Sequence, residues 1–186
     1  MRRTLTGLVA VAAFALSAPA LAADPAAQKA ELRKMCDDAL ATLYKAKPEA
    51  KALVQKSAGY GCFSSFGISF FVGGAGGRGL VHDNATKKTV FMNMGQASGG
   101  LDFGVKDYRE VLVFKDKETL AKFIDKGWEF GGQATAAAAA GGKGAKAEDT
   151  EVSSSPITVY PMTKTGLALG VAAGARKYWK DEDLNK

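Results

Sequence analysis

The residues that could do chemistry in this chain are few. They are two cysteines (Cys36 and Cys62), one histidine (His82, followed by Asp83) and a glycine-rich run at 74–79. A single histidine, without Cys or His partners at ligand spacing, does not build a metal site. An enzyme that uses Cys62 or His82 is a hypothesis that rests on residue type alone. We therefore predict no enzymatic activity, no metal and no cofactor.

The run at 74–79 matches the pattern G-x-G-x-x-G. A dinucleotide site needs this turn between a strand and a helix, so that the helix N-terminus meets the pyrophosphate. Here the next residues, Leu80–Asp83, are typical of a strand and a turn. We predict a glycine-rich turn between two close strands rather than a nucleotide site.

The two cysteines allow two interpretations. In an oxidising compartment Cys36 and Cys62 could form a disulfide, which would stabilise the chain by roughly 3 kcal/mol in the loop-entropy model. They could equally be two small buried thiols. The sequence leaves both interpretations open.

The N-terminus has the form of a signal peptide. Met1–Arg3 is basic, Leu5–Leu16 is apolar and rich in alanine, and Ala20–Ala22 has the small-x-small form of a cleavage site. We predict a signal peptide over 1–22 and one domain over 23–186. The expected location is the periplasm, or the cell surface after secretion.

The charge of the chain is positive but spread out. Lys and Arg number 25 against 19 Asp and Glu, for a net charge of +6. No segment concentrates these charges as a nucleic-acid-binding face does, so we predict no nucleic-acid partner. A mild positive charge permits attraction to anionic lipid, at about 1 kcal/mol for each Lys or Arg that reaches the surface.

Three segments have the periodicity of helices. The first, 25–47, repeats apolar residues at three- and four-residue spacing, and Pro48 ends it. A second short helix runs from 48 to about 56, with Gly59 as its stop. The third, 116–126, has Asp116 as its N-cap, turns three apolar side chains inward and ends at Gly127. Those three side chains are Leu120, Phe123 and Ile124.

The remaining segments favour strands. Residues 57–77 carry no charge, and 60–71 are rich in aromatic residues. The segment 57–77 contains seven glycines, which argue against a membrane span and favour short buried strands joined by tight turns. The less favoured interpretation is that part of this segment contacts a lipid bilayer. Further strands are expected at 78–82, 89–94, 101–105, 109–114, 157–162 and 167–173. The residues 180–186 are expected to form a charged tail.

Four segments, in their order along the chain, resemble the SYLF-domain family. They are GGAGGRGL at 73–80, GQASGGLDFG at 95–104, VLVF at 111–114 with GWEFG at 127–131, and GLALG at 166–170. The resemblance covers about residues 47–176. It implies that 129–140 form a strand, although the alanine run there favours a helix by propensity.

The resemblance also implies a non-enzymatic lipid-binding domain. The expected fold class is α+β, with two N-terminal helices packed on a mainly antiparallel, strongly curved sheet and one further helix crossing it. We expect peripheral binding to anionic lipid, with basic residues of the N-terminal helices on the headgroups and nearby apolar side chains inserted shallowly. The candidate residues are Lys29, Arg33, Lys34, Lys45, Lys47 and Lys51. The alternative is an envelope interaction protein that holds a protein partner by strand edges or by the aromatic segment.

Overall fold

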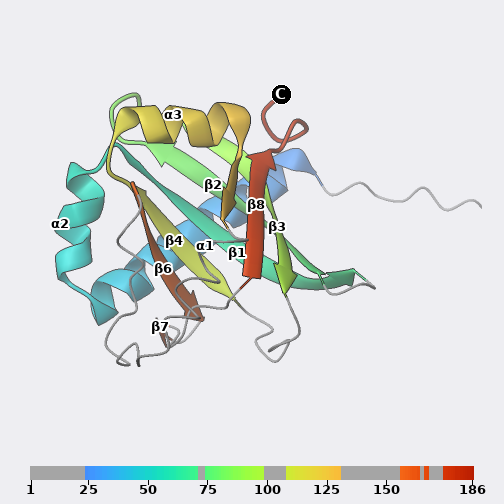
Figure 1. Ribbon diagram of the computed structural model, residues 1–186, viewed down its shortest axis with the longest axis horizontal. Coiled ribbons are helices and arrows are strands. Elements are labelled where there is room, and N and C mark those ends of the chain that lie inside the picture. Colours follow the sequence, from blue (N-terminus) through green and yellow to red (C-terminus); the bar gives the residue numbers. More distant parts are fainter. Residues whose placement is uncertain (1–23, 71–73, 99–107, 131–155, 164–165, 168–173) are drawn as a thin grey trace, which may run out of the picture.

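Figure 1 shows the computed structural model, which describes residues 24–70, 74–98, 108–130, 156–163, 166–167 and 174–186. Within these ranges lie three helices and eight strands. The helices are α1 (Pro25–Ala46), α2 (Glu49–Lys56) and α3 (Lys117–Lys126). The strands are β1 (Gly59–Phe70), β2 (Gly74–Asp83), β3 (Thr89–Ser98), β4 (Arg109–Phe114), β5 (Trp128–Phe130), β6 (Ile157–Thr163), β7 (Gly166–Leu167) and β8 (Gly174–Lys180).

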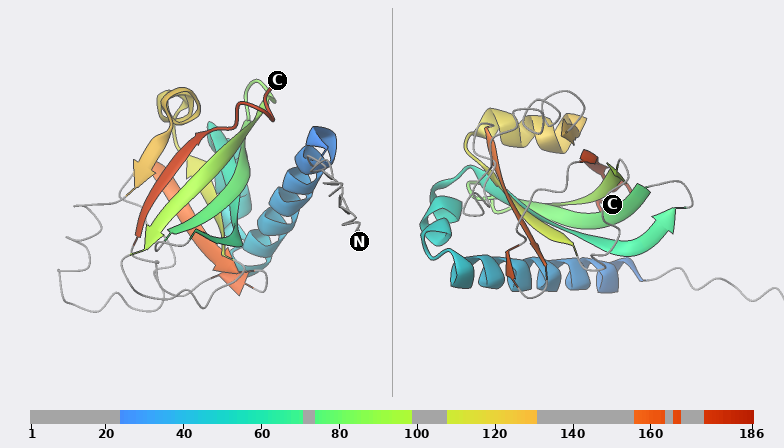
Figure 2. Two further views of the ribbon diagram at one scale, coloured as in Figure 1. Left: turned by 90° about the vertical axis from the view of Figure 1, so that its right-hand side faces the viewer. Right: turned by 60° about the horizontal axis from the view of Figure 1, so that its bottom comes forward.

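The strands form one antiparallel sheet in the order β5-β8-β3-β2-β1-β4-β6-β7. The sheet is strongly curled: Tyr178 of β8 packs edge-on against Phe63 of β1, with ring centroids 4.8 Å apart, although two strands lie between β8 and β1. Figure 2 shows the strands curving between α1 on one side and α3 on the other. We call the side under α1 the outer face and the side under α3 the inner face. The predicted α+β fold with a curved antiparallel sheet is confirmed.

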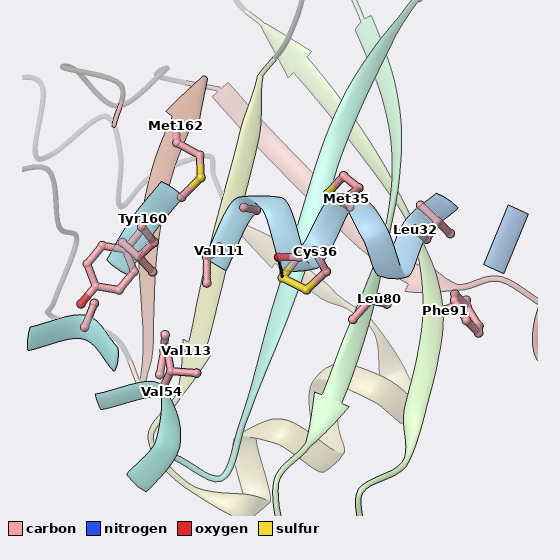
Figure 3. Close-up of a cluster of buried hydrophobic side chains, with 14 of the residues drawn as sticks. Leu32, Met35, Cys36, Val54, Leu80, Phe91, Val111, Val113, Tyr160 and Met162 are labelled. Atoms are coloured by element: carbon pink, nitrogen blue, oxygen red, sulfur yellow. Dashed lines mark hydrogen bonds between the residues drawn. A yellow bond between two sulfur atoms is a disulfide. The ribbon is translucent and has the colours of Figure 1, made fainter. Parts of the chain in front are cut away.

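Helix α1 begins and ends close to the residues predicted from the sequence, at Pro25 and Ala46. The Asp24 side chain caps the N-terminus by accepting from the backbone N–H of Ala26 at 3.0 Å, and Pro25 occupies the first turn. Its apolar stripe packs on the outer face of the sheet, where Figure 3 shows Leu32 near Phe91 and, farther along, Tyr160 and Met162 of β6. Every buried side chain of α1 lies on this stripe: Leu32, Met35, Cys36, Ala39 and Leu43.

Helix α3 closes the inner face. The Asp116 carboxylate caps it by accepting from the backbone N–H of Thr119 at 2.7 Å, and Gly127 follows its end with a φ of 74°. Phe123 is fully buried against Phe114, with ring centroids 4.9 Å apart, and also contacts Tyr178. The predicted cap, stop and inward residues of this helix are confirmed, with Ile124 packed at the margin of the inner core.

The glycine-rich run at 74–79 is a strand and not the predicted turn. Residues 74–83 form β2, which pairs with β1 on one side and β3 on the other. Gly79 lies opposite Phe63, and a Cβ atom on it would overlap the Phe63 ring and the Cys62 carbonyl oxygen. Glycine is needed there because the Phe63 ring lies directly over the neighbouring backbone.

Residues 59–70 also differ from the prediction. They form the single strand β1, with one register shift between Ser65 and Ser69, rather than several short strands. Gly59 begins this strand and does not stop α2, which ends at Lys56 with Ser57 as its C-cap. A Cβ on Gly59 would overlap the His82 carbonyl oxygen, so this glycine too permits close strand approach. Strand β8, at 174–180, was not predicted.

Several predictions fall outside the described residues. These are the signal peptide at 1–22, the strand at 101–105, the strand at 131–140 beyond β5, and the part of the last hairpin at 168–173. The described part of that hairpin pairs Met162 with Leu167. Among the helices that the structure describes, none is long and apolar enough to cross a bilayer.

Candidate functional site

The six basic residues predicted to bind lipid fall into three places. Lys29 and Arg33 project from the first turns of α1 and lie over the Phe91 ring of β3, at 5.8 and 5.3 Å from its centroid. Lys34 and Lys45 lie on the side of α1 opposite its buried stripe, and both are exposed. Lys47 lies over the Tyr160 ring, at 5.7 Å, and Lys51 is exposed on α2. The structure therefore does not bring all six together.

The basic residues at the two ends of α1 form two separate groups of charge. Lys29 and Lys47 are separated by 18 residues of sequence, which corresponds to about 27 Å along a helix. Screening at physiological salt reduces charge effects beyond about 8 Å. Between them Lys34 forms an exposed ion pair with Asp38 at 3.0 Å. A surface pair of this kind leaves little net positive charge on the outward side of α1.

The first turns of α1 gather a third cation. Arg78 of β2 is exposed and donates a hydrogen bond to the side chain of Gln28, the residue before Lys29. We call Lys29, Arg33 and Arg78 the cation cluster. Asp183, in the C-terminal turn, lies within electrostatic reach of it. The pKa of Asp183 is lowered, first by its hydrogen bond to Lys186 and in smaller part by Arg78.

A disulfide holds α1 against the sheet. Cys36 of α1 and Cys62 of β1 are bonded, with their Sγ atoms 1.97 Å and their Cα atoms 5.2 Å apart. Both residues are buried in the outer core, next to Leu80 and Val111. Of the two interpretations left open by the sequence, the structure has the disulfide. It fixes the helix that carries Lys29 and Arg33.

The remaining sequence candidates for chemistry are engaged elsewhere. The sulfur of Cys62 is in the disulfide and is not a free thiol. His82 is half-buried, and its Nδ1 lies 3.2 Å from the Thr89 hydroxyl. Burial, and then Lys87, lower the pKa of His82. The Asp83 carboxylate accepts from the backbone N–H groups of Ala85 and Thr86, so it shapes a turn rather than orienting the histidine.

A buried ionic cluster on the inner face was not predicted from the sequence. Glu110 of β4 is fully buried and accepts from Arg176 of β8 at 2.6 Å. It also accepts from the Tyr108 hydroxyl at 2.9 Å and from the Tyr178 hydroxyl. The Arg176 guanidinium lies 5.2 Å from the Tyr108 ring centroid. Strands β4 and β8 have three strands between them, so only the curl of the sheet brings these residues together.

This cluster sets the ionisation of its members. Burial, followed by the charge of Glu110, raises the pKa of Tyr108 and of Tyr178 well above 10.0. The negative charge of Glu110 also raises the pKa of Arg176, against the opposing effect of its burial. The phenols therefore remain protonated donors and the guanidinium remains charged. With its carboxylate fully bonded, the cluster joins the two sides of the curled sheet.

One signal in the sequence could have revealed this cluster. Alternate residues of a strand share a face, so Glu110 lies on the same face as the buried Leu112 and Phe114. A carboxylate at a core position needs a charged or hydrogen-bonding partner. That partner, Arg176, is 66 residues away, and no local pattern identifies it.

Comparison with known proteins agrees with the sequence resemblance. Residues 95–186 match a family model described as Ysc84, a Las17-binding protein actin regulator. The chain is also 32% identical over 155 residues to a protein of Aeromonas veronii named beta cell expansion factor A. That alignment covers 83% of this chain and 58% of the relative, so the chain spans just over half of the relative's length.

Proposed function

The chain belongs to the SYLF (Ysc84) family through residues 95–186, and we propose that it is a non-enzymatic protein that binds anionic lipid membranes peripherally. Family membership supports a lipid- or actin-related binding domain. Among these, the observation that favours lipid is the cation cluster. Its three basic side chains come from two elements and lie at one end of the outer face.

The proposed mechanism is electrostatic docking by the cation cluster. Each Lys or Arg near an anionic membrane contributes about 1 kcal/mol, so three together contribute about 3 kcal/mol, or about 150-fold in partitioning. The disulfide and the Phe91 ring hold Lys29 and Arg33 in place, which lowers the entropic cost of ordering them at the membrane. Lys47 and Lys51, at the other end of α1, belong to a separate surface. The proposed setting is the bacterial cell envelope, reached through the signal predicted at 1–22.

Vesicle flotation tests this function. Residues 23–186 should float with vesicles of equal parts phosphatidylglycerol and phosphatidylcholine at low salt, and much less at high salt or with pure phosphatidylcholine. Arg33→Glu combined with Arg78→Glu should reduce the bound fraction strongly. Lys117→Glu combined with Lys126→Glu, two exposed residues of α3 on the opposite side of the sheet, is the matched control and should bind normally. Equal binding of both double variants would contradict the mechanism.

The second candidate function is binding to a protein partner. The description of the matching family model names a protein partner and actin regulation, which favours this candidate. It predicts no flotation with any vesicle and specific recovery of one protein by crosslinking. In the aromatic segment, which is the predicted alternative contact for a partner, Phe63 is fully buried and Tyr60 is half-buried, so the Phe63 ring does not reach the surface.

A further inference from the structure

Trp179 of β8 is a large apolar side chain that is exposed to solvent. It keeps 43% of its surface accessible, whereas Tyr178, the residue before it, is fully buried. Successive side chains of a strand point to opposite faces, so Trp179 lies on the outer face when Tyr178 lies on the inner one. Its six-membered ring lies over Gly95 of β3, where a Cβ atom would come within 3.3 Å of it.

The surroundings of Trp179 are polar and basic. In the strand register Asn93 lies between Arg78 and Trp179, in one row across β2, β3 and β8. In the next row Gly95 lies beside Lys177, whose ammonium group pairs with the Glu129 carboxylate at 2.8 Å. We call Arg78, Asn93, Gly95, Lys177 and Trp179 the Trp179 surface. The six predicted lipid-binding residues included none of them.

The Trp179 surface adjoins the cation cluster. Arg78 belongs to both, and Asn93 is two residues along β3 from Phe91, the ring beneath Lys29 and Arg33. An indole beside basic side chains is the combination found where proteins meet the interface of a membrane. The ring partitions into the boundary between headgroups and acyl chains, while the cations meet anionic headgroups. Lys29, Arg33 and Arg78 together carry three positive charges beside the single carboxylate of Asp183, so an anionic surface is the complementary occupant.

We propose that the Trp179 surface is the part of this protein that enters the membrane interface, with the Trp179 ring as its apolar anchor. This inference rests on the proposed lipid binding. It assigns which side chain enters the membrane and how the protein is oriented on it. The outer face at β3 and β8, rather than the outward side of α1, faces the bilayer. The cation cluster then lies at the headgroup level beside the inserted ring.

Tryptophan fluorescence tests the orientation directly, because the chain has two tryptophans. Trp128→Phe leaves Trp179 as the single fluorophore, and Trp179→Phe leaves Trp128, which is partly buried and stacks on Phe123 at 6.4 Å. With phosphatidylglycerol–phosphatidylcholine vesicles the emission of Trp179 should shift to the blue and be quenched by brominated acyl chains. The emission of Trp128 should change little.

A second measurement uses binding itself. Trp179→Ala should reduce vesicle partitioning about tenfold, since a large apolar area no longer enters the interface. Leu53→Ala is the matched control, because Leu53 is 37% exposed on α2 and lies outside the Trp179 surface. It should partition normally. Circular dichroism should show both variants folded.

The outcomes separate the two proposals. If the wild-type protein floats but Trp179 is not quenched and Trp179→Ala binds normally, the anchor is wrong and the lipid function stands. If the wild-type protein does not float with any vesicle, both proposals fail. A blue shift that appears without vesicles and grows with protein concentration would indicate a second copy of the chain on this surface, which would overturn the lipid assignment.

Discussion

Replacing Glu110 by leucine should lower the free energy of unfolding by about 3–5 kcal/mol. The carboxylate is fully buried and accepts from Arg176, Tyr108 and Tyr178. Its removal takes away the carboxylate that pairs with the buried Arg176 guanidinium and that accepts from both phenols. For a domain with a total stability of about 5–15 kcal/mol, this is a large fraction.

A double-mutant cycle in urea measures this effect. Glu110→Leu combined with Arg176→Leu removes both charges, so it should recover most of the loss seen in Glu110→Leu alone. Glu110→Gln retains an acceptor for the phenols and should cost about 2 kcal/mol, which provides a milder variant should the leucine variant not fold. A loss below about 1 kcal/mol for Glu110→Leu, or a double variant whose loss equals the sum of the two single losses, would refute the reasoning.

Two further predictions concern the disulfide and alkaline pH. Replacing Cys36 and Cys62 together by alanine removes a cross-link between residues 26 apart in sequence, and it should lower the free energy of unfolding by about 3 kcal/mol. The loss is measured as a lower urea midpoint. An unchanged midpoint would contradict this prediction. Because the pKa of Tyr108 and of Tyr178 is raised in the folded state, their stabilising effect is present below pH 10 and is lost as the pH rises above it. The phenolate absorbance of these two tyrosines should therefore appear together with the loss of the circular dichroism signal. If both tyrosines ionise near pH 10 while the fold stays intact, the prediction is wrong.

The three helices and two strands, β4 and β6, were predicted with nearly correct boundaries. Helix α3 follows from Asp116 at its start, Gly127 at its end and apolar residues at three- and four-residue spacing. Strand β4 was predicted at its observed bounds from a run of β-branched and apolar residues. These signals are local in sequence, so each segment carries them without knowledge of its neighbours.

Two errors came from segments whose conformation depends on a neighbour. The glycines at 77 and 79 were interpreted as a turn because glycine is typical of turns. In the structure each lies where a Cβ atom would overlap strand β1: the Ser64 carbonyl oxygen at Gly77, and the Phe63 ring at Gly79. Gly59 was predicted as a helix stop, but it lies on β1, where a Cβ atom would overlap the His82 carbonyl oxygen of β2. A single strand cannot reveal which of its positions lies under a neighbour's side chain, because that depends on strand register.

The sequence by itself determined the α+β class, the family and the three helices, whereas it left open whether Cys36 and Cys62 are bonded. Only the tertiary structure decided which polar side chains meet. Glu110 and Arg176 are 66 residues apart, and Gln28 and Arg78 are 50 apart. The curl of the sheet brings the first pair together, and the packing of α1 across the outer face brings the second. Those contacts depend on the order and register of strands distant in sequence, and residue spacing along one segment does not contain that information.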